Sequence, residues 1–174
     1  MTPPQDEPQR FRQLTERARR DRDASRAAVA ILKAESRLAQ ELERALAEAD
    51  LTLPQFNLLM ELAVTPDAAL PLYELNARMI ATAPSTSWLS TRMQEAGLVT
   101  KARHPDDARV VILAMTEAGW TALERALPHV VDTEQRLLAG YTTGELRALA
   151  RLLGPLADAA GSQEDGGGPR RPAH

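Results

Sequence analysis

The stretch from residue 72 to residue 113 constrains the fold more than any other part of the chain. Leu72, Leu75 and Met79 recur at helical spacing and predict a short first helix. A second helix is predicted from about Pro84 to Ala96, because proline is tolerated in a first helical turn. Two helices joined by so short a turn are typical of a helix-turn-helix.

The second predicted helix has an apolar side and a polar side. Leu89, Met93 and Ala96 share one face and are expected to point inward. The side chains expected to point outward are Ser85, Thr86, Ser87, Trp88, Thr91 and Arg92. Short hydroxyl side chains at the start of an exposed helix can reach base edges in the major groove of DNA. This helix is therefore predicted to read DNA.

A β-hairpin is predicted directly after the second helix. Gly97 ends that helix, because the left-handed conformation of a helix end costs glycine nothing. A strand at 98–102, the turn-forming cluster at 103–109 and a β-branched return strand at 110–113 then form a wing. The sequence thus predicts a mainly α-helical protein with a small β-wing, a winged helix-turn-helix.

Composition narrows the class of protein. Aromatic residues make up 3% of the 174 residues, so leucine and alanine must supply the core. The chain has no cysteine, which excludes disulfides, thiolate catalysis and thiol redox sensing. The first ten residues lack the apolar segment of a signal peptide, and no apolar run approaches the roughly 18 residues of a membrane span. We therefore expect a cytoplasmic protein.

The charge of the predicted motif is more informative than that of the whole chain. The net charge is −3, which by itself disfavours DNA. Between residues 78 and 109, however, the sequence has five basic residues and three acidic ones, an excess of two positive charges. They are Arg78, Arg92, Lys101, Arg103 and Arg109 against Glu95, Asp106 and Asp107. This modest excess suits salt-sensitive binding to phosphates.

Long amphipathic helices are predicted on both sides of the motif. The first covers residues 27–49, Thr116 caps another that runs to about residue 139, and a T-x-x-E box at Thr142 opens a last helix that weakens at Pro155. Their apolar stripes exceed the core that one small chain offers, so a second copy is expected to cover them.

One further helix is predicted before the motif. Thr52 and Gln55 form a T-x-x-Q capping box, and residues 66–70 turn the chain into the motif. The inward face of this helix is expected to hold Phe56, Leu59, Met60 and Ala63. The expected domains are an arm at 1–23 (disordered or a short basic helix), a dimerisation helix at 24–50, the DNA-binding domain at 51–115, dimerisation helices at 116–160 and a disordered tail at 161–174.

Three short motifs carry a family resemblance: GLV at 97–99, D-x-R at Asp107 and Arg109, and LAMTEAG at 113–119. With their spacing, the chain resembles the MarR family of bacterial transcriptional regulators over about residues 24–157. The resemblance implies a homodimer built by the terminal helices, which places two winged helices on a pseudo-palindromic operator. It also implies that the protein is a repressor, and no cofactor is expected.

The resemblance assigns expected roles to individual residues. Ser85, Thr86 and Ser87 would meet base edges, while Arg92 and Lys101 would contact phosphates. The full predicted DNA-binding set is Ser85, Thr86, Ser87, Trp88, Thr91, Arg92, Lys101, Arg103 and Arg109, with Asp107 supporting the wing. Trp88 and Thr91 depart from the family pattern, which usually has arginine and often aspartate there. The indole of Trp88 either contacts DNA or packs over the Arg92 stem.

The resemblance also implies a small, often aromatic, anionic effector that releases the repressor from DNA. The candidate lining residues are Ile31, Phe56, Asn57 and Met60; the alternative is that the apolar ones are plain core and Asn57 faces solvent. An enzyme is disfavoured, since the three histidines (His104, His129 and His174) lack metal-ligand spacing. A winged-helix module that binds only proteins remains the alternative function.

Overall fold

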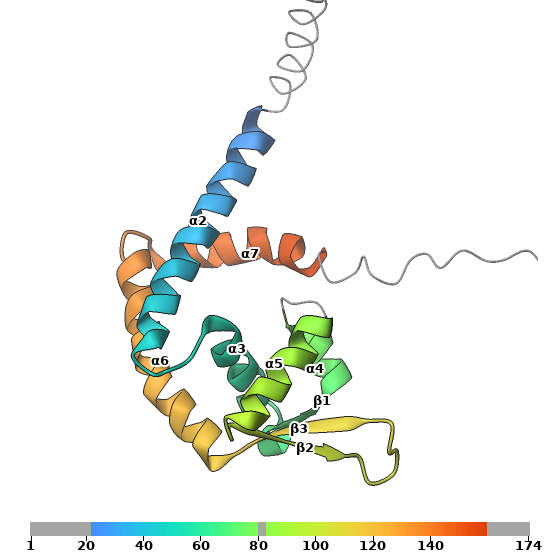
Figure 1. The fold of residues 1–174 in the computed structure, drawn as a ribbon. Helices are drawn as coiled ribbons and strands as arrows, with labels where there is room; N and C mark the ends of the chain where they lie inside the picture. The colour runs from blue at the N-terminus through green and yellow to red at the C-terminus, as the bar shows by residue number, and fades with distance from the viewer. Residues whose placement is uncertain (1–21, 80–82, 160–174) are drawn as a thin grey trace, which may run out of the picture. The chain divides into compact units, whose positions relative to one another are not determined.

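The computed structural model describes residues 22–79 and 83–159 (Figure 1). The chain divides into two compact units, residues 1–41 and residues 42–174. The basic segment predicted as a short helix lies mostly outside the described residues, and the predicted tail from residue 161 lies wholly outside them.

Helix α2, Arg22–Ala47, begins earlier than the sequence predicted. Residues 22–40 are all exposed or half-exposed. On this part of the helix Arg37 and Glu41 form an ion pair one turn apart, with 2.9 Å between Nη2 and Oε1. Further along α2, Leu42 and Leu46 belong to the second unit and are buried in its core.

Helix α3, Leu53–Ala63, starts with the capping box that the sequence predicted. The Gln55 amide donates to Thr52 Oγ1 at 3.4 Å, and the Thr52 amide donates to Gln55 Oε1 at 2.9 Å. Two N–H groups of the first turn are thereby satisfied. The buried side of α3 is wider than predicted and consists of Phe56, Leu58, Leu59 and Leu62. Met60 and Ala63 are only partly buried against it.

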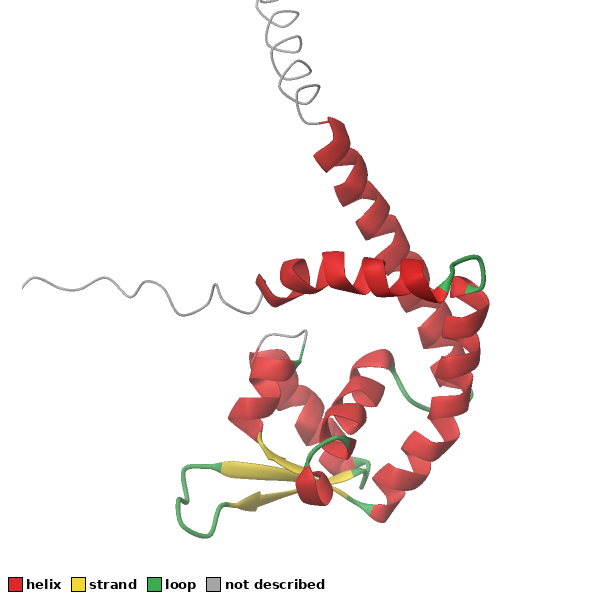
Figure 2. Cartoon of the chain, turned by 180° about the vertical axis from the view of Figure 1, so that it is seen from behind, coloured by secondary structure: helices red, strands yellow, loops and turns green. Residues whose placement is uncertain are grey.

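A three-stranded antiparallel sheet lies beneath the helices of the second unit (Figure 2). Its strands are β1 (Ala69–Pro71), β2 (Val99–Arg103) and β3 (Val111–Met115), in the order β1-β3-β2. Leu70 of β1 stands opposite Leu113 of β3, and both are buried. The loop between β2 and β3 extends beyond the helices as the predicted wing (Figures 1 and 2).

The segment 66–70, predicted to turn the chain into the motif, also contains regular structure that was not predicted. Pro66–Ala68 forms one turn of 3-10 helix, and the next three residues form β1. The hydrogen-bonding partner of β1 is β3, about forty residues further along the chain. A three-residue strand has no periodicity of its own, so only this distant pairing identifies it.

The two helices of the predicted helix-turn-helix are α4, Leu72–Arg78, and α5, Ala83–Glu95. Residues 80–82, which contain part of the predicted start signal of the second helix, lie outside the described residues. Gly97 has φ of 74°, the left-handed conformation expected of it, and the Leu98 amide donates to the Met93 carbonyl at 2.9 Å. The motif is thus present at the predicted residues.

Two helices follow the wing: α6, Glu117–Leu138, and α7, Thr143–Ala159. The Thr116 hydroxyl accepts from the Gly119 amide at 3.1 Å, as a cap should, and donates to the Gly97 carbonyl at 2.7 Å. The prediction that α7 weakens at Pro155 is wrong, because the helix continues past it. Proline removes one backbone donor but does not prevent later residues from closing their own bonds.

Large apolar side chains remain exposed on the three long helices. They are Val29, Leu32 and Leu38 on α2, Leu127 and Val131 on α6, and Leu149, Leu152 and Leu156 on α7. Among the helices of the described ranges, none has the length and apolar character that crossing a membrane requires.

Candidate nucleic-acid interface

One side of α5 is buried and the other is exposed. Thr86, Leu89, Ser90 and Met93 form the buried stripe, spaced as i, i+3, i+4 and i+7. The prediction that Thr86 faces outward is therefore wrong. Its place in the helical repeat decides its direction, and its hydroxyl does not. Ala96, predicted to face inward, is exposed because α5 has ended before it.

The exposed side of α5 carries the remaining predicted residues. These are Ser85, Ser87, Trp88, Thr91 and Arg92. The Ser87 carbonyl accepts two hydrogen bonds, from Ser90 Oγ at 2.9 Å and from Thr91 Oγ1 at 3.0 Å. The first gives the buried Ser90 hydroxyl a partner, which explains how a serine can occupy the core side of the helix.

Trp88 is 68% exposed and contacts the side chain one turn further along α5. The Arg92 guanidinium carbon lies over its ring, 5.9 Å from the centroid. Arg92 also pairs with Glu95, at 3.3 Å between Nη1 and Oε2, and both of these side chains are well exposed. An exposed pair of this kind contributes about 0 to 1 kcal/mol, so Arg92 can exchange its carboxylate for another anion at little cost.

Lys101 on β2 contacts Thr91 on α5. Its Nζ donates to Thr91 Oγ1 at 2.8 Å. Burial lowers the pKa of Lys101 below its usual value, because a half-buried ammonium loses hydration. The structure thus brings together two of the predicted residues that lie ten positions apart in sequence.

The turn of the wing is held by Asp107. Its carboxylate accepts from the Arg109 amide at 2.9 Å, and its carbonyl accepts from the Val110 amide at 3.0 Å. This is consistent with the predicted wing-supporting role. The carboxylate contact is with the backbone of Arg109 and leaves the guanidinium available.

Two more side chains are used inside the wing. Arg103 Nη1 donates to the Ala108 carbonyl at 2.7 Å, across the turn. The Asp106 amide donates to Nδ1 of His104, a half-buried side chain, at 3.2 Å. Arg103, predicted as a DNA contact, therefore also closes the wing that it belongs to.

Helix α4 carries its own ion pairs. Arg78 lies 3.7 Å from a carboxylate oxygen of Glu74 and 4.0 Å from one of Glu61. Tyr73 Oη donates to Glu74 Oε1 at 3.2 Å, and this hydrogen bond, with the charge of Glu74, raises the pKa of Tyr73. The positive charge of Arg78 is largely balanced by these neighbours.

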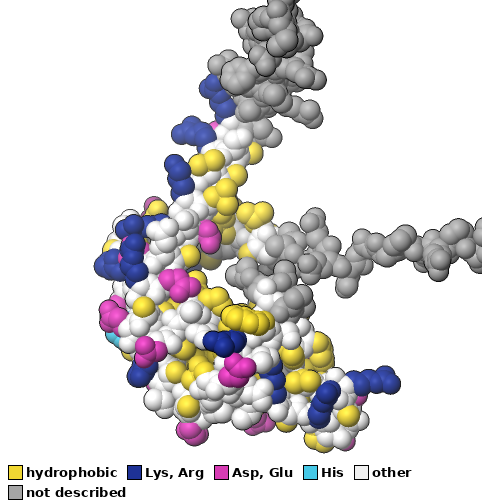
Figure 3. Space-filling model, in the orientation of Figure 1, with side chains coloured by type: hydrophobic (Ala, Val, Ile, Leu, Met, Phe, Trp, Pro, Cys, Tyr) yellow, Lys and Arg dark blue, Asp and Glu magenta, His cyan; other side chains and the backbone are white. Residues whose placement is uncertain are grey.

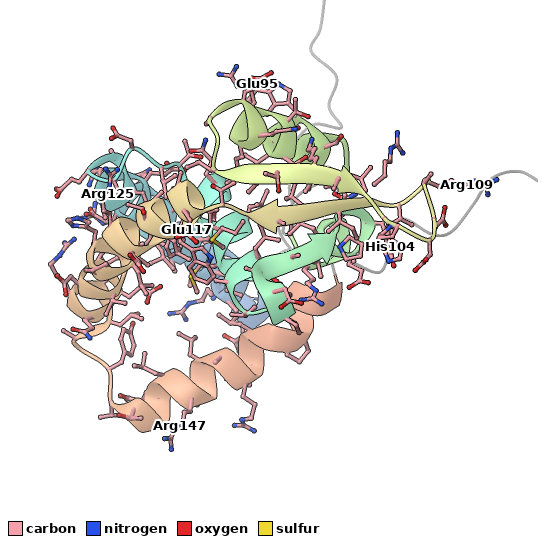
Figure 4. The ribbon with its side chains drawn as sticks, turned by 90° about the horizontal axis from the view of Figure 1, so that it is seen from below. Glu95, His104, Arg109, Glu117, Arg125 and Arg147 are labelled. Carbon is pink, nitrogen blue, oxygen red and sulfur yellow. The ribbon has the colours of Figure 1, made fainter. Side chains whose placement is uncertain are left out.

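Arg109 differs from the other four basic side chains between residues 78 and 109. It is the one whose side chain has no intramolecular partner among the described residues. Figure 4 places it at the end of the wing, and basic side chains stand out on the wing surface in Figure 3. A cation in this position can meet an external anion without breaking a side-chain contact among residues 22–79 and 83–159.

The sequence relatives of the chain are repressors. The chain is 29% identical to the HTH-type transcriptional repressor IacR of Pseudomonas putida over 123 residues, 71% of this chain and 72% of the repressor. It is 26% identical to the homoprotocatechuate degradative operon repressor of Escherichia coli over 104 residues, 60% and 69% of the two chains. Residues 51–111 match the MarR family. The winged-helix segment of the chain is a MarR family domain.

A solved MarR family structure has the same fold. Sco3205 of Streptomyces coelicolor, a MarR family transcriptional regulator in complex with DNA, superposes with a TM-score of 0.75 at 24% identity, over 81% of this chain and 93% of that one. The segment that matches the MarR family, residues 51–111, extends from α3 to the first residue of β3. It therefore contains the whole candidate interface.

Some features of this MarR family site were not predicted from the sequence. The Lys101 contact with Thr91 joins two elements whose facing sides the sequence does not specify. The inward position of Thr86 had a signal, because Thr86, Leu89 and Met93 already satisfy the helical repeat.

The predicted effector residues are divided between the two units. Phe56, Asn57 and Met60 lie on α3, where Phe56 is part of the core and the other two are half-buried. Ile31 belongs to the N-terminal unit, so the expected site with α3 stays a prediction. Across residues 22–79 and 83–159, no three acidic or histidine side chains gather as a metal site requires.

Proposed function

We propose that the protein is a transcriptional repressor that binds a two-fold symmetric DNA site as a homodimer. The observation that carries this proposal is the exposed side of α5, with Trp88 and Arg92, together with the wing, where the Arg109 side chain has no partner among the described residues. Two of the sequence relatives are repressors. Two proteins of similar fold, Sco3205 and a MarR mutant of E. coli, were solved in complex with DNA.

The roles follow from the placement of the side chains. Ser85 and Ser87, at the exposed start of α5, are proposed to meet base edges, and Arg92 and Lys101 to contact phosphates. Arg109 is proposed to contact DNA from the wing. Thr86 is left out of this set, since its side chain is buried in the core.

Dimerisation is proposed to use the exposed apolar side chains of α2, α6 and α7. Leu32 and Leu152 are each more than two-thirds exposed. Covering one such side chain is worth about 1.5 to 3 kcal/mol, so a second copy with the same faces gains substantially by association. A two-fold dimer would place its two α5 helices on half-sites about 10 base pairs apart.

The proposed repressor is released from DNA by a small aromatic ligand. Two fold relatives support this class of ligand: BpsR of Bordetella bronchiseptica is regulated by 6-hydroxynicotinic acid, and RdhR was solved with 2,4-dichlorophenol. We propose Phe56, Asn57 and Met60 of α3 as lining residues. The MarR family consists of regulators, so no catalytic activity is proposed. We propose that the protein acts in the cytoplasm, where its operator lies.

The direct test is to sequence the genomic fragments that the purified protein enriches from its own genome. The expected result is one recurring, two-fold symmetric motif, bound by the full chain at physiological salt. Arg92→Ala should weaken binding to this motif. Arg147→Ala, the same loss of charge on α7, is the matched control and should bind as the wild type does.

Other outcomes separate the alternatives. Recovery of fragments at random, with equal affinity for unrelated duplexes, would contradict a sequence-specific repressor. No binding to any duplex would favour the winged-helix protein-interaction module. The ligand part has its own test: aromatic acids and phenols are screened by thermal shift, and each hit is then added to the protein–DNA complex. Stabilising ligands that leave the complex intact would contradict release by ligand.

A further inference from the structure

The contact between Thr91 and Lys101 connects the helix that is proposed to read DNA with the first strand of the wing. Thr91 is exposed on α5, and Lys101 is half-buried on β2. The 2.8 Å separation of Lys101 Nζ and Thr91 Oγ1 is a well-formed hydrogen bond. Lysine has a flexible four-carbon stem, so this bond selects one position of the ammonium among many.

The hydroxyl of Thr91 is used in two directions. It has one hydrogen and two acceptor lone pairs. The hydrogen is donated to the Ser87 carbonyl at 3.0 Å, and one lone pair accepts from Lys101. Thr91 therefore has no hydrogen left to donate to a base acceptor. The Lys101 ammonium has three hydrogens, of which this contact uses one, so two remain for an external acceptor.

We propose that Thr91 is a positioning residue that holds the Lys101 ammonium beside α5, ready to contact an anionic phosphate of the DNA backbone. This inference rests on the proposed DNA-binding function and assigns to Thr91 a role other than base contact. The energetic reason is the ordering of a long side chain: a lysine already held in place gives up less rotamer freedom when DNA binds.

Four variants of the full chain test the proposal on the duplex that the protein enriches. Thr91→Val keeps the shape and removes the hydroxyl, and Thr91→Ser keeps the hydroxyl. Lys101→Met removes the charge. Thr121→Val is the matched control, because Thr121 on α6 also donates to the carbonyl four residues earlier, at 3.0 Å, but the described structure gives it no lysine partner.

The variants are expected to differ in their DNA affinity and in the salt dependence of binding. Thr91→Val should raise Kd about threefold to tenfold per half-site, the cost of ordering one lysine, with an unchanged salt slope because the phosphate contact is still made. Lys101→Met should raise Kd and also reduce the salt slope by about 0.9 for each phosphate that the ammonium no longer neutralises. Thr91→Ser should restore wild-type affinity, and Thr121→Val should not change it.

The double variant gives the decisive comparison. In the Lys101→Met background, Thr91→Val should have no further effect, because the residue it positions is gone. A further loss of affinity there would show that Thr91 contacts DNA itself and would overturn the proposal, as would wild-type affinity of Thr91→Val alone.

A measurement without DNA separates this proposal from the proposed function. NMR relaxation of the Lys101 ammonium nitrogen should show restricted motion in the wild type and free motion in Thr91→Val. Equal motion in both would overturn the positioning role. If this difference is found but no duplex is bound, the proposed function has failed and the proposed phosphate contact with it, whereas the link between Thr91 and Lys101 stands.

Discussion

The guanidinium of Arg92 lies over the ring of Trp88, with its central carbon 5.9 Å from the ring centroid. An exposed cation–π contact is worth about 0.5 to 1 kcal/mol, and the indole remains 68% exposed in its presence. Packing over Arg92 thus accounts for where the ring lies without covering it. The same ring is still available to the apolar methyl group of a thymine.

The first prediction concerns base preference at Trp88. An indole has one N–H donor and cannot make the paired hydrogen bonds by which arginine recognises guanine. Trp88→Arg should therefore create a preference for guanine of about 1 to 3 kcal/mol at one position per half-site. Trp88→Ala should strongly reduce DNA affinity while changing the melting temperature of the free protein little. Binding to duplexes with single-base changes checks both variants.

A fluorescence control accompanies this prediction. The chain has two tryptophans, Trp88 and the half-buried Trp120 of α6, so the experiment uses Trp120→Phe as its background. Trp88 emission should then change when the operator is added. Unchanged emission, together with identical base preference in all three proteins, would leave only the packing role.

The two wing arginines should behave differently. Arg109 has no described side-chain partner, so Arg109→Ala should lower DNA affinity and the salt slope without changing the melting temperature. Arg103 donates to the Ala108 carbonyl, so Arg103→Ala should also loosen the wing. Amide hydrogen exchange at residues 104–109 measures this loosening. Faster exchange in the Arg109 variant than in the Arg103 variant would reverse the assignment.

The lowered pKa of Lys101 predicts an alkaline limit to DNA binding. Burial disfavours the ammonium in the free protein, whereas a nearby phosphate favours it, so DNA should raise the pKa again. Affinity should therefore be constant at neutral pH and fall as the pH rises through the lowered pKa, before the ordinary lysine value of 10.5 is reached. Fluorescence anisotropy across this range measures it.

Lys101→Arg is the control for that pH dependence, because a guanidinium stays charged throughout. Its affinity should remain level where that of the wild type falls. The stability of the free protein should change in the opposite direction: the cost of a buried ammonium is fully present below the lowered pKa and is relieved as the pH rises through it. Parallel curves for the two proteins would refute the assignment to Lys101.

Local patterns were enough to predict most of the helices. The capping box at Thr52 and Gln55 and the left-handed Gly97 were both readable from short motifs. Strand β1 was not, because its identity depends on pairing with β3 far along the chain. At the site, the exposure of Trp88 and Arg92 on α5 was predicted correctly. Thr86 was predicted to be exposed because its side chain is polar, whereas its position in the helical repeat places it on the buried side.

Contacts between elements were beyond the reach of the sequence. The hydrogen bond between Lys101 and Thr91 requires the register of β2 and the rotation of α5 to be known together. In the same way, Arg125 Nη2 donates to the Ala49 carbonyl at 2.7 Å across 76 residues of sequence. No periodicity carries such information, since each helix pattern specifies a buried side and does not name the neighbour that covers it.

Gly119 should be the least replaceable glycine of the described structure. A Cβ there would lie 2.3 Å from the Leu98 carbonyl oxygen and 2.8 Å from Met115 Cγ. That carbonyl already accepts from the Thr116 amide, so it cannot move freely. Gly119→Ala should lower the free energy of unfolding by about 1 to 3 kcal/mol, as overpacking does. Gly144→Ala in α7 meets no close atom and should be neutral or stabilising. Urea unfolding compares them, and equal stabilities would contradict the clash.

The last prediction concerns the exposed apolar faces. Leu152 on α7 is 69% exposed and Val64, after α3, is 71% exposed. If the long helices form the dimer, Leu152→Glu should bury a charge in the interface and release monomers at micromolar concentration. Val64→Glu adds the same charge outside these helices and should leave the dimer intact. Light scattering gives the mass of each. A wild-type protein with the mass of one chain, or a dimer unaffected by Leu152→Glu, would show that α7 does not build the interface.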